Sequence, residues 1–254
     1  SMTIGSRVFV YAYPGTELGR IYGAGYLRAP EGAYYTDEGG NIIDCSGQVV
    51  VDPTTGNPII DETNLKDFGS IFPDWKGGFN QTVSYKNLSL SMSFAFQHGG
   101  NAYSVTNFAL GYLGKLKNSL DGRYDGLIHE GVNLNPDGTY APNKTITTKI
   151  STYYGEYVLG RRNVETNVHS TSYFKMKECR LDYNFNKRLL NKMGLSFFQS
   201  LSMGIYATNL FSITNWPQYD PDVASFVGSS LKRGVETGGY PMTRTFGANL
   251  KLSF

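Results

Sequence analysis

Apolar and polar residues alternate strictly over residues 244–254, where the chain ends. The apolar positions are Phe246, Ala248, Leu250, Leu252 and Phe254, and the polar ones are Thr245, Gly247, Asn249, Lys251 and Ser253. A period of two predicts a β-strand with one apolar and one polar face. The length of this stretch matches the roughly 9 to 11 tilted residues that a strand needs to cross a bilayer.

The same alternation recurs in residues 76–97 and predicts a hairpin with a tight turn at 85–87. Its second strand alternates without exception: Leu88, Leu90, Met92, Phe94 and Phe96 face away from Ser89, Ser91, Ser93, Ala95 and Gln97. The outer face of a soluble sheet would carry more Lys and Glu, which keep strand edges from associating. A small, hydroxylated face is typical of a lumen instead.

Two further strands are predicted at 173–185 and 201–208, and residues 21–27 are also expected to be extended. On the first of these strands Glu178, Arg180 and Asp182 fall on the polar face. We expect these three charges to neutralise one another on a wet interior surface. Contact with a polar substrate is the alternative.

Long, turn-rich segments separate the predicted strands. Residues 29–75 are expected to be a loop with one short hairpin within 42–60, residues 104–120 a short amphipathic helix, and 121–170 and 216–243 further loops. Asp220 and Asp222 flank a proline in the last of these and are expected to be solvated turn residues. Long and short connections therefore alternate along the strands, as they do in outer-membrane barrels.

About six strands are predicted in all, whereas about eight are needed to close a barrel. An open sheet in lipid would leave unpaired backbone groups along its edges, which is prohibitively costly. Either some strands lie within the predicted loops, or the chain forms part of a larger barrel. The expected fold class is all-β: an antiparallel transmembrane barrel segment with long extracellular loops and one short loop helix.

Composition supports an all-β protein and narrows its chemistry. Aromatic residues make up 14% and charged residues 17% of the chain, with 30 glycines; a helical enzyme would show more Ala, Glu and Lys. The net charge of +2 gives no indication of nucleic-acid binding. Cys45 and Cys179 form no disulfide framework. From the pattern of residues we expect no signal peptide and no transmembrane helix, and the first two residues resemble a cloning remnant.

No residue pattern in the sequence indicates catalysis, cofactor binding or metal binding. His98, His129 and His169 lie in separate segments without metal-ligand spacing, and no nucleophile elbow is present. The stretch 133–138 is similar to the start of a calcium loop, but Lys144 occupies the position where such a loop needs Glu, so we interpret it as a turn. We expect no catalytic residue, no metal site and no cofactor.

Six segments, in this order, resemble signatures of the SusC/RagA-type TonB-dependent outer-membrane transporters of Bacteroidetes. They are residues 19–26 (GRIYGAGY), 72–79 (FPDWKGGF), 96–101 (FQHGGN), 209–216 (NLFSITNW), 219–222 (YDPD) and 239–246 (GYPMTRTF). The resemblance covers about 19–254 and implies that residues 1–254 are the C-terminal part of a barrel of about 22 strands, without its plug domain and TonB box. It also implies uptake of glycans or peptides across the bacterial outer membrane.

The resemblance further implies the partners and one residue role. A SusD-like surface lipoprotein would cap the transporter, TonB would act through the N-terminal part absent here, and the barrel wall would contact outer-membrane lipid. In the family the terminal aromatic strand is recognised by the barrel-assembly machinery, which would give this role to Phe254.

Four aromatic residues near predicted strand ends have two interpretations. Trp75, Trp216, Tyr219 and Tyr240 are expected to belong to an interfacial aromatic girdle or to pack within loops. Stacking against sugar rings is the alternative and would make them substrate-binding. Two other functions remain open: a complete small porin or adhesin-like barrel of about eight to ten strands, and a soluble, secreted carbohydrate-binding β-sandwich.

Overall fold

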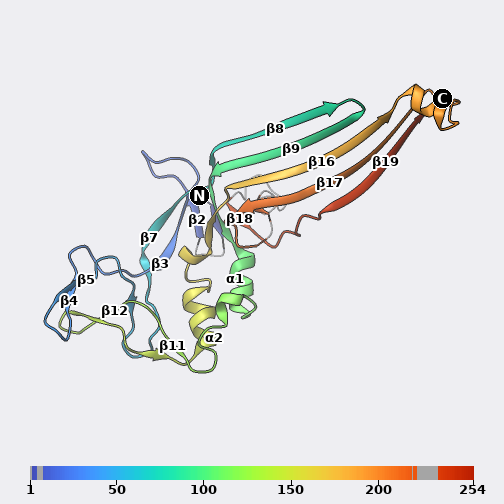
Figure 1. Ribbon diagram of the computed structural model, residues 1–254. Coiled ribbons are helices and arrows are strands. Elements are labelled where there is room, and N and C mark those ends of the chain that lie inside the picture. The colour runs from blue at the N-terminus through green and yellow to red at the C-terminus, as the bar shows by residue number, and fades with distance from the viewer. Residues whose placement is uncertain (1, 5–7, 219, 222–233) are drawn as a thin grey trace. The chain divides into compact units, whose positions relative to one another are not determined.

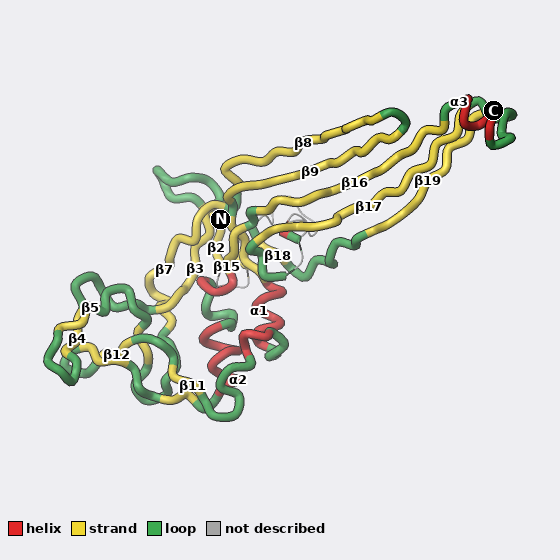
Figure 2. Tube along the Cα trace, in the orientation of Figure 1, coloured by secondary structure: helices red, strands yellow, loops and turns green. Residues whose placement is uncertain are grey.

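The chain divides into two compact units, each assembled from separate stretches of sequence. The computed structural model describes residues 2–4, 8–218, 220–221 and 234–254. Unit 1 draws on residues 1–72, 101–169 and 224–239, and unit 2 on residues 73–100, 170–223 and 240–254. Most regular structure is strand, as the tube view shows (Figure 2), so the all-β class expected from the sequence is confirmed.

Unit 2 is a single antiparallel sheet of five long strands (Figure 1). In spatial order they are β19 (Thr245–Ser253), β17 (Ser200–Thr214), β16 (Tyr173–Phe185), β9 (Leu88–Gly99) and β8 (Pro73–Tyr85). The strands predicted from the alternating pattern are all present, and most run a few residues further than the pattern indicates. Lys86 adopts a left-handed conformation with φ of 54° in the tight turn between β8 and β9.

The register of this sheet keeps the two kinds of side chain apart. Leu181 of β16 lies opposite Leu90 of β9 and Ile205 of β17, and Ile205 lies opposite Ala248 of β19. Because directly opposed residues of antiparallel strands share a face, the apolar side chains of all five strands form one continuous surface. The polar side chains form the other surface.

Four connections join the five strands of unit 2. A tight turn joins β8 to β9, whereas β16 leads to β17 through residues 186–199, which contain the short helix α3 (Lys187–Lys192). The side chain of Asn186 caps α3 by accepting a hydrogen bond from the Leu189 N–H group. The remaining connections, from β9 to β16 and from β17 to β19, include residues 101–169 and 224–239 of unit 1. Shorter and longer connections therefore alternate along the strands of this sheet.

Unit 1 is built around a second antiparallel sheet that the sequence predicts only in part. Its order is β1 (Met2–Ile4), β2 (Val8–Tyr11), β3 (Arg20–Tyr26) and β7 (Ile60–Ser70). One face of β2 and β3 packs against Tyr103, Val164 and Val235 in a buried cluster. The prediction that residues 29–75 form a loop is wrong for β7, whose polar side chains show no alternation and which is held by pairing with β3.

Short strands occupy much of what the sequence predicts to be loop. The hairpin expected within 42–60 is present, because Val51 bridges Pro58 in antiparallel fashion and the Ile59 N–H group donates to the Val50 carbonyl at 2.9 Å. A second hairpin lies just before it, where β4 (Tyr34–Thr36) pairs with β5 (Ile42–Asp44). The other short strands are β6 (Val50–Val51), β10 (Asn101–Ser104), β11 (Leu127–Ile128), β12 (Val132–Leu134), β13 (Tyr140–Pro142), β14 (Ile146–Thr147), β15 (Val168–Ser170) and β18 (Val235–Glu236). They pair in small sheets of two or three strands and do not join the five-stranded sheet.

The helices of unit 1 are short. The predicted helix within 104–120 is found as α1 (Val105–Tyr112), capped by Ser104, followed by the 3₁₀ turn η1 (Lys117–Ser119). Further along are α2 (Ile150–Thr152), the π-helical segment η2 (Tyr153–Val158) and η3 (Glu165–Asn167). In the part of the chain that the structure describes, every helix is too short or too polar to span a membrane.

Candidate functional site

The polar face of the unit 2 sheet carries cross-strand hydroxyl pairs. The hydroxyls of Thr82 and Ser91 lie 3.1 Å apart, and those of Ser84 and Ser89 lie 2.9 Å apart. Because small hydroxyl groups bond to one another across the β8–β9 pair, these positions are polar without carrying charge.

One ion pair lies at the centre of the same face. The Arg180 guanidinium donates two bonds to the Asp182 carboxylate, from Nε to Oδ2 at 2.6 Å and from Nη2 to Oδ1 at 3.0 Å. With its amide oriented to match its neighbours, Asn249 accepts from Arg180 Nη2 at 3.1 Å and donates to the Gly204 carbonyl at 3.2 Å. The structure thus brings Arg180 and Asp182 together, whereas Glu178 is exposed and outside this pair.

A second ion pair, which the sequence does not reveal, joins Lys175 of β16 to Asp220. Lys175 Nζ lies 3.1 Å from Asp220 Oδ2 and 3.4 Å from Oδ1, and 4.5 Å from the centre of the Tyr173 ring. Asp220 is buried, so its expected role as a solvated turn residue is wrong. Asp222, expected to behave in the same way, lies outside the described residues.

The four aromatic candidates are in different environments. Trp75 stacks on His98 with ring centres 5.4 Å apart and is 53% exposed, and Tyr240 is 91% exposed. Trp216 is buried, as expected of loop packing, and Tyr219 lies outside the described residues. Trp75 and Tyr240 are therefore the two whose rings are accessible to a ligand.

Phe254 forms an aromatic cluster with the connection between β16 and β17. Its ring centre lies 5.7 Å from that of Phe197 and 5.3 Å from that of Phe198, and its side chain remains largely exposed. The end of the described chain is therefore packed locally by aromatic contacts.

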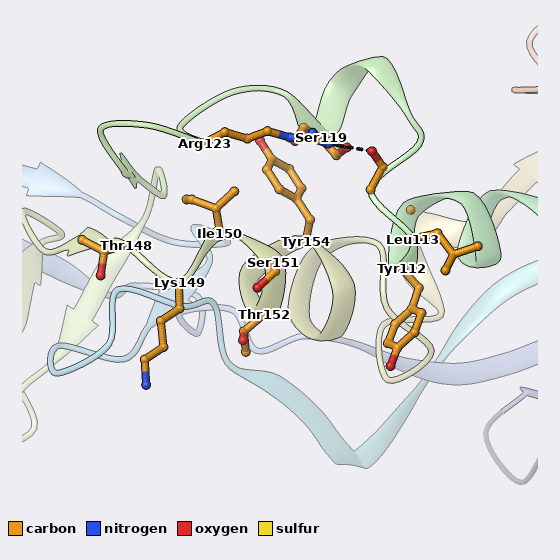
Figure 3. Close-up of a pocket in the computed structure, with 12 residues that line it drawn as sticks. Tyr112, Leu113, Ser119, Arg123, Thr148, Lys149, Ile150, Ser151, Thr152 and Tyr154 are labelled. Atoms are coloured by element: carbon orange, nitrogen blue, oxygen red, sulfur yellow. Dashed lines mark hydrogen bonds between the residues drawn. The ribbon is translucent and has the colours of Figure 1, made fainter.

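A hollow of about 600 Å³ opens in unit 1 between the end of α1 and the start of α2 (Figure 3). Its lining includes Arg123, whose Nε donates to the Ser119 carbonyl at 2.8 Å. Tyr154 also lines it, and burial raises the pKa of this phenol. Sequence analysis misses this site because the lining residues form no motif and belong to segments predicted as helix and loop.

Candidate ligands for metals do not converge. Within the described residues, no group of three or more His, Cys, Asp and Glu side chains could hold a metal ion. His129 bonds the Tyr153 hydroxyl at 2.6 Å, and burial lowers the pKa of this imidazole. Asp137 accepts from the Thr139 N–H group in the turn between β12 and β13, so the interpretation of 133–138 as a turn is confirmed.

These features define the class of protein: a predominantly β chain whose large antiparallel sheet has one exposed apolar face and one polar face, as in proteins of the outer membrane. Comparison with known proteins refines that class. No family model matches the chain. Curated relatives are TonB-dependent receptors P3 and P26 of Formosa agariphila, 25% identical over 248 residues and 26% identical over 237 residues. They are matched over 94% and 90% of this chain.

Solved structures show the same fold. The RagAB peptide importer in the closed-closed state matches all of this chain with a TM-score of 0.55 and 19% identity. A structure of the RagAB peptide transporter matches 92% with a TM-score of 0.52 and 16% identity. The chain spans 22% and 20% of the two receptors and 25% and 26% of the two solved chains.

The resemblance to TonB-dependent outer-membrane transporters of the SusC/RagA type is confirmed by these comparisons. The expected location in the outer membrane of a Gram-negative bacterium is confirmed with it. The relatives are receptors and transporters by name.

Proposed function

We propose that residues 1–254 are the C-terminal part of a SusC/RagA-type TonB-dependent importer and supply barrel wall and extracellular loops. The observation that carries this proposal is the open five-stranded sheet of unit 2, with one continuous apolar face. Side chains on that face are exposed: Val83 is 53%, Ile205 61% and Leu250 59% accessible. A contiguous apolar surface of this kind marks contact with lipid or with another protein.

The polar face indicates which of these contacts applies. Hydroxyl pairs and the Arg180–Asp182 ion pair line one side of the sheet, opposite the apolar side. Strands that alternate apolar outward and polar inward are typical of outer-membrane barrels with aqueous interiors. We assign the apolar face to lipid and the polar face to the lumen.

The edges of the sheet support a share in a larger barrel. Among the described strands, β8 pairs only with β9 and β19 pairs only with β17. Unpaired backbone groups in hydrocarbon cost several kcal/mol each, so further strands must complete both edges. A complete small barrel is disfavoured because the other described strands pair in separate sheets. Closure with additional strands fits a barrel of about 22 strands.

Substrate and partners follow from the same assignment. The imported substrate is a peptide or a glycan; RagAB is described as a peptide importer. Loops of unit 1 would face a SusD-like surface lipoprotein, TonB would act through the N-terminal part of the transporter, and the barrel-assembly machinery would recognise Phe254. Glu178, Arg180, Asp182, Trp75, Tyr219 and Tyr240 are the proposed substrate contacts from the sheet and its loops. Trp216, which is buried, would instead pack beneath them within the loops.

Folding in buffer and in detergent micelles tests the lipid-facing assignment. Near-UV circular dichroism during a thermal ramp reports packing of the aromatic side chains. We expect a cooperative transition in micelles alone or in neither solvent, because the apolar face needs an apolar environment and the open edges need the missing strands. A sharp transition in buffer alone would refute the assignment and favour a soluble β-sandwich.

A second measurement determines which face of the unit 2 sheet contacts lipid and which contacts water. Single cysteines placed at Leu250 and Asn249, neighbours with opposite orientation on β19, are labelled with a fluorescent dye after Cys45 and Cys179 are replaced by Ser. In lipid vesicles we expect a membrane-soluble quencher to act on the dye at 250 and a water-soluble quencher on the dye at 249. Equal quenching at both positions would contradict the two-faced wall.

A further inference from the structure

The hollow in unit 1 combines a polar lining with an imbalance of charge. The main chain and side chains of α1, η1 and α2 surround it (Figure 3). Hydroxyl groups come from Ser119, Thr148, Ser151 and Thr152. The lining residues that are charged at neutral pH are Arg123 and Lys149, both cationic, and none of the lining residues is Asp or Glu. Such a hollow favours a hydrogen-bonding ligand with negative charge.

Arg123 is held in place by neutral acceptors. Its Nη2 donates to the Gly114 carbonyl at 2.6 Å and to the Ser119 hydroxyl at 3.0 Å, and its Nε donates to the Ser119 carbonyl. These bonds fix the guanidinium plane without neutralising its charge, and they use Nε and Nη2 rather than Nη1. A preorganised guanidinium loses little entropy when it binds a planar anion such as a carboxylate.

Lys149 provides the second positive charge. It is exposed and precedes α2 directly, and in Figure 3 its side chain extends away from Arg123, so it would have to change rotamer to reach the same ligand. Lys144 of the same unit contrasts with it, because Lys144 Nζ lies 2.8 Å from Glu38 Oε1. Asp121 is close enough to act on the Tyr154 hydroxyl with the opposite sign to Arg123, but it does not line the hollow.

We propose that this hollow binds the carboxylate group of a ligand, with Arg123 as the oriented donor and Lys149 as a mobile second cation. The inference rests on the proposed import function and narrows its substrate class to acidic ligands. Two sources share this chemistry: the carboxyl end of a peptide and a uronic acid residue of a glycan. The hydroxyl groups of the lining suit the amide groups of the first and the hydroxyl groups of the second.

Binding is measured by isothermal titration calorimetry on the full chain, in the solvent in which its near-UV spectrum shows folding. The peptide probes are N-acetyl-trialanine with a free carboxyl group and its C-terminal amide. The sugar probes are a glucuronic-acid disaccharide and its methyl ester. Each acid differs from its control only in the charge that the hollow is proposed to read.

We expect at least one acid to bind about tenfold more tightly than its neutral control, with an affinity that falls as salt is added. Lys149→Gln should weaken the acid several-fold and leave the neutral probe unchanged, and Lys149→Arg should retain binding. Lys144→Gln, an exposed lysine that does not line the hollow, is the matched control. If the acid binds more tightly than its control in the peptide pair alone, the ligand is a peptide carboxylate. If it does so in the sugar pair alone, the ligand is a uronate. If it does so in both pairs, the hollow binds any accessible carboxylate.

Equal binding of acid and neutral probes, absence of binding by both acids, or equal effects of Lys149→Gln and Lys144→Gln would overturn the inference. The lipid-facing assignment is tested separately, by whether the chain needs detergent to fold. A chain that folds in micelles and shows no carboxylate preference refutes the acidic-ligand site alone. A chain that folds in buffer refutes the membrane wall, and the binding experiment still decides the site.

Discussion

Lys175 and Asp220 form a buried ion pair, with Nζ 3.1 Å from Oδ2 and side-chain exposures of only 3% and 9%. Lys175 lies on β16, and Asp220 belongs to the segment that follows β17. The ion pair therefore holds the segment that follows β17 against strand β16. Because burial of a charge without a partner is costly, this contact stabilises both side chains.

Removing one charge should destabilise unit 2 far more than removing an exposed pair. We expect Asp220→Asn to lower the free energy of unfolding by about 3 kcal/mol, since a charged hydrogen-bonded contact to a buried ammonium is lost. Urea unfolding in detergent micelles measures this change. Glu38→Gln, which breaks the exposed pair with Lys144, should have a much smaller effect because solvent screens that pair. Equal effects of the two variants would show that Asp220 does not stabilise the sheet.

Glu236 provides a second test, in unit 1. Its carboxylate is 3% exposed and accepts from the Ser104 hydroxyl at 2.8 Å and from the Thr106 hydroxyl at 2.5 Å. The N–H groups of Thr106, Gly238 and Gly239 also donate to it. It thus binds the start of α1, where main-chain N–H groups lack helical partners.

The pKa of Glu236 determines the pH dependence. Burial alone would raise it, but the hydroxyl and main-chain donors together hold it below the ordinary value. A carboxylate with a lowered pKa in the folded state stabilises that state fully above its unfolded pKa, and this contribution disappears as pH falls through the folded pKa. We expect Glu236→Gln to cost about 1 to 3 kcal/mol at pH 7 and to flatten the loss of stability below about pH 4.3.

Urea unfolding at a series of pH values checks both statements. Glu31→Gln, at an exposed position of the same unit, is the control and should change stability by less than about 0.5 kcal/mol. If the wild-type protein and Glu236→Gln lose stability in parallel on acidification, the carboxylate is not the group that titrates.

The two units differ in how far their sequence determines their structure. Strand β9 alternates without interruption, so its period of two is sufficient to predict both the strand and its faces. Strand β7 carries polar side chains on both faces and exists because β3 supplies its hydrogen-bond partners. Pattern analysis detects the first kind of strand and misses the second.

The candidate sites also differ in how far the sequence predicts them. Arg180 and Asp182 are two residues apart on one strand, so their pairing follows from strand periodicity alone. Lys175 and Asp220 are 45 positions apart, and their contact depends on the path of a connecting segment. The hollow in unit 1 is even harder to predict from the sequence. Main-chain carbonyls orient Arg123, and any residue type supplies such a carbonyl.

Gly204 should be intolerant of a side chain because the Arg180 network occupies the space beside it. A Cβ atom there would overlap Asp182 Oδ1 and the Asn249 amide. We expect Gly204→Ala to displace both groups and to lower stability in micelles by about 1 to 3 kcal/mol, as overpacking does. Ser202→Ala, on the same face of β17, is the matched control with an expected change below about 1 kcal/mol. A melting temperature of Gly204→Ala equal to that of Ser202→Ala would show that the network moves freely.

Phe254 raises the question of whether an aromatic residue acts through packing or through recognition during assembly. Its contacts with Phe197 and Phe198 predict a contribution of about 0.5 to 1.5 kcal/mol per aromatic pair. Phe246 is a suitable control because it lies on β19, the strand that ends directly before Phe254, and is 69% exposed, against 68% for Phe254. If Phe254 is recognised by the barrel-assembly machinery, Phe254→Ala should slow insertion into vesicles only when the machinery is present.

Phe246→Ala should then affect insertion equally in both kinds of vesicle, and Phe254→Trp should restore the machinery-dependent rate because an aromatic ring is retained. Protease protection of the inserted chain over time measures each rate. If Phe254→Ala slows insertion to the same extent without the machinery, the ring stabilises the strand end through Phe197 and Phe198, and its role is packing alone.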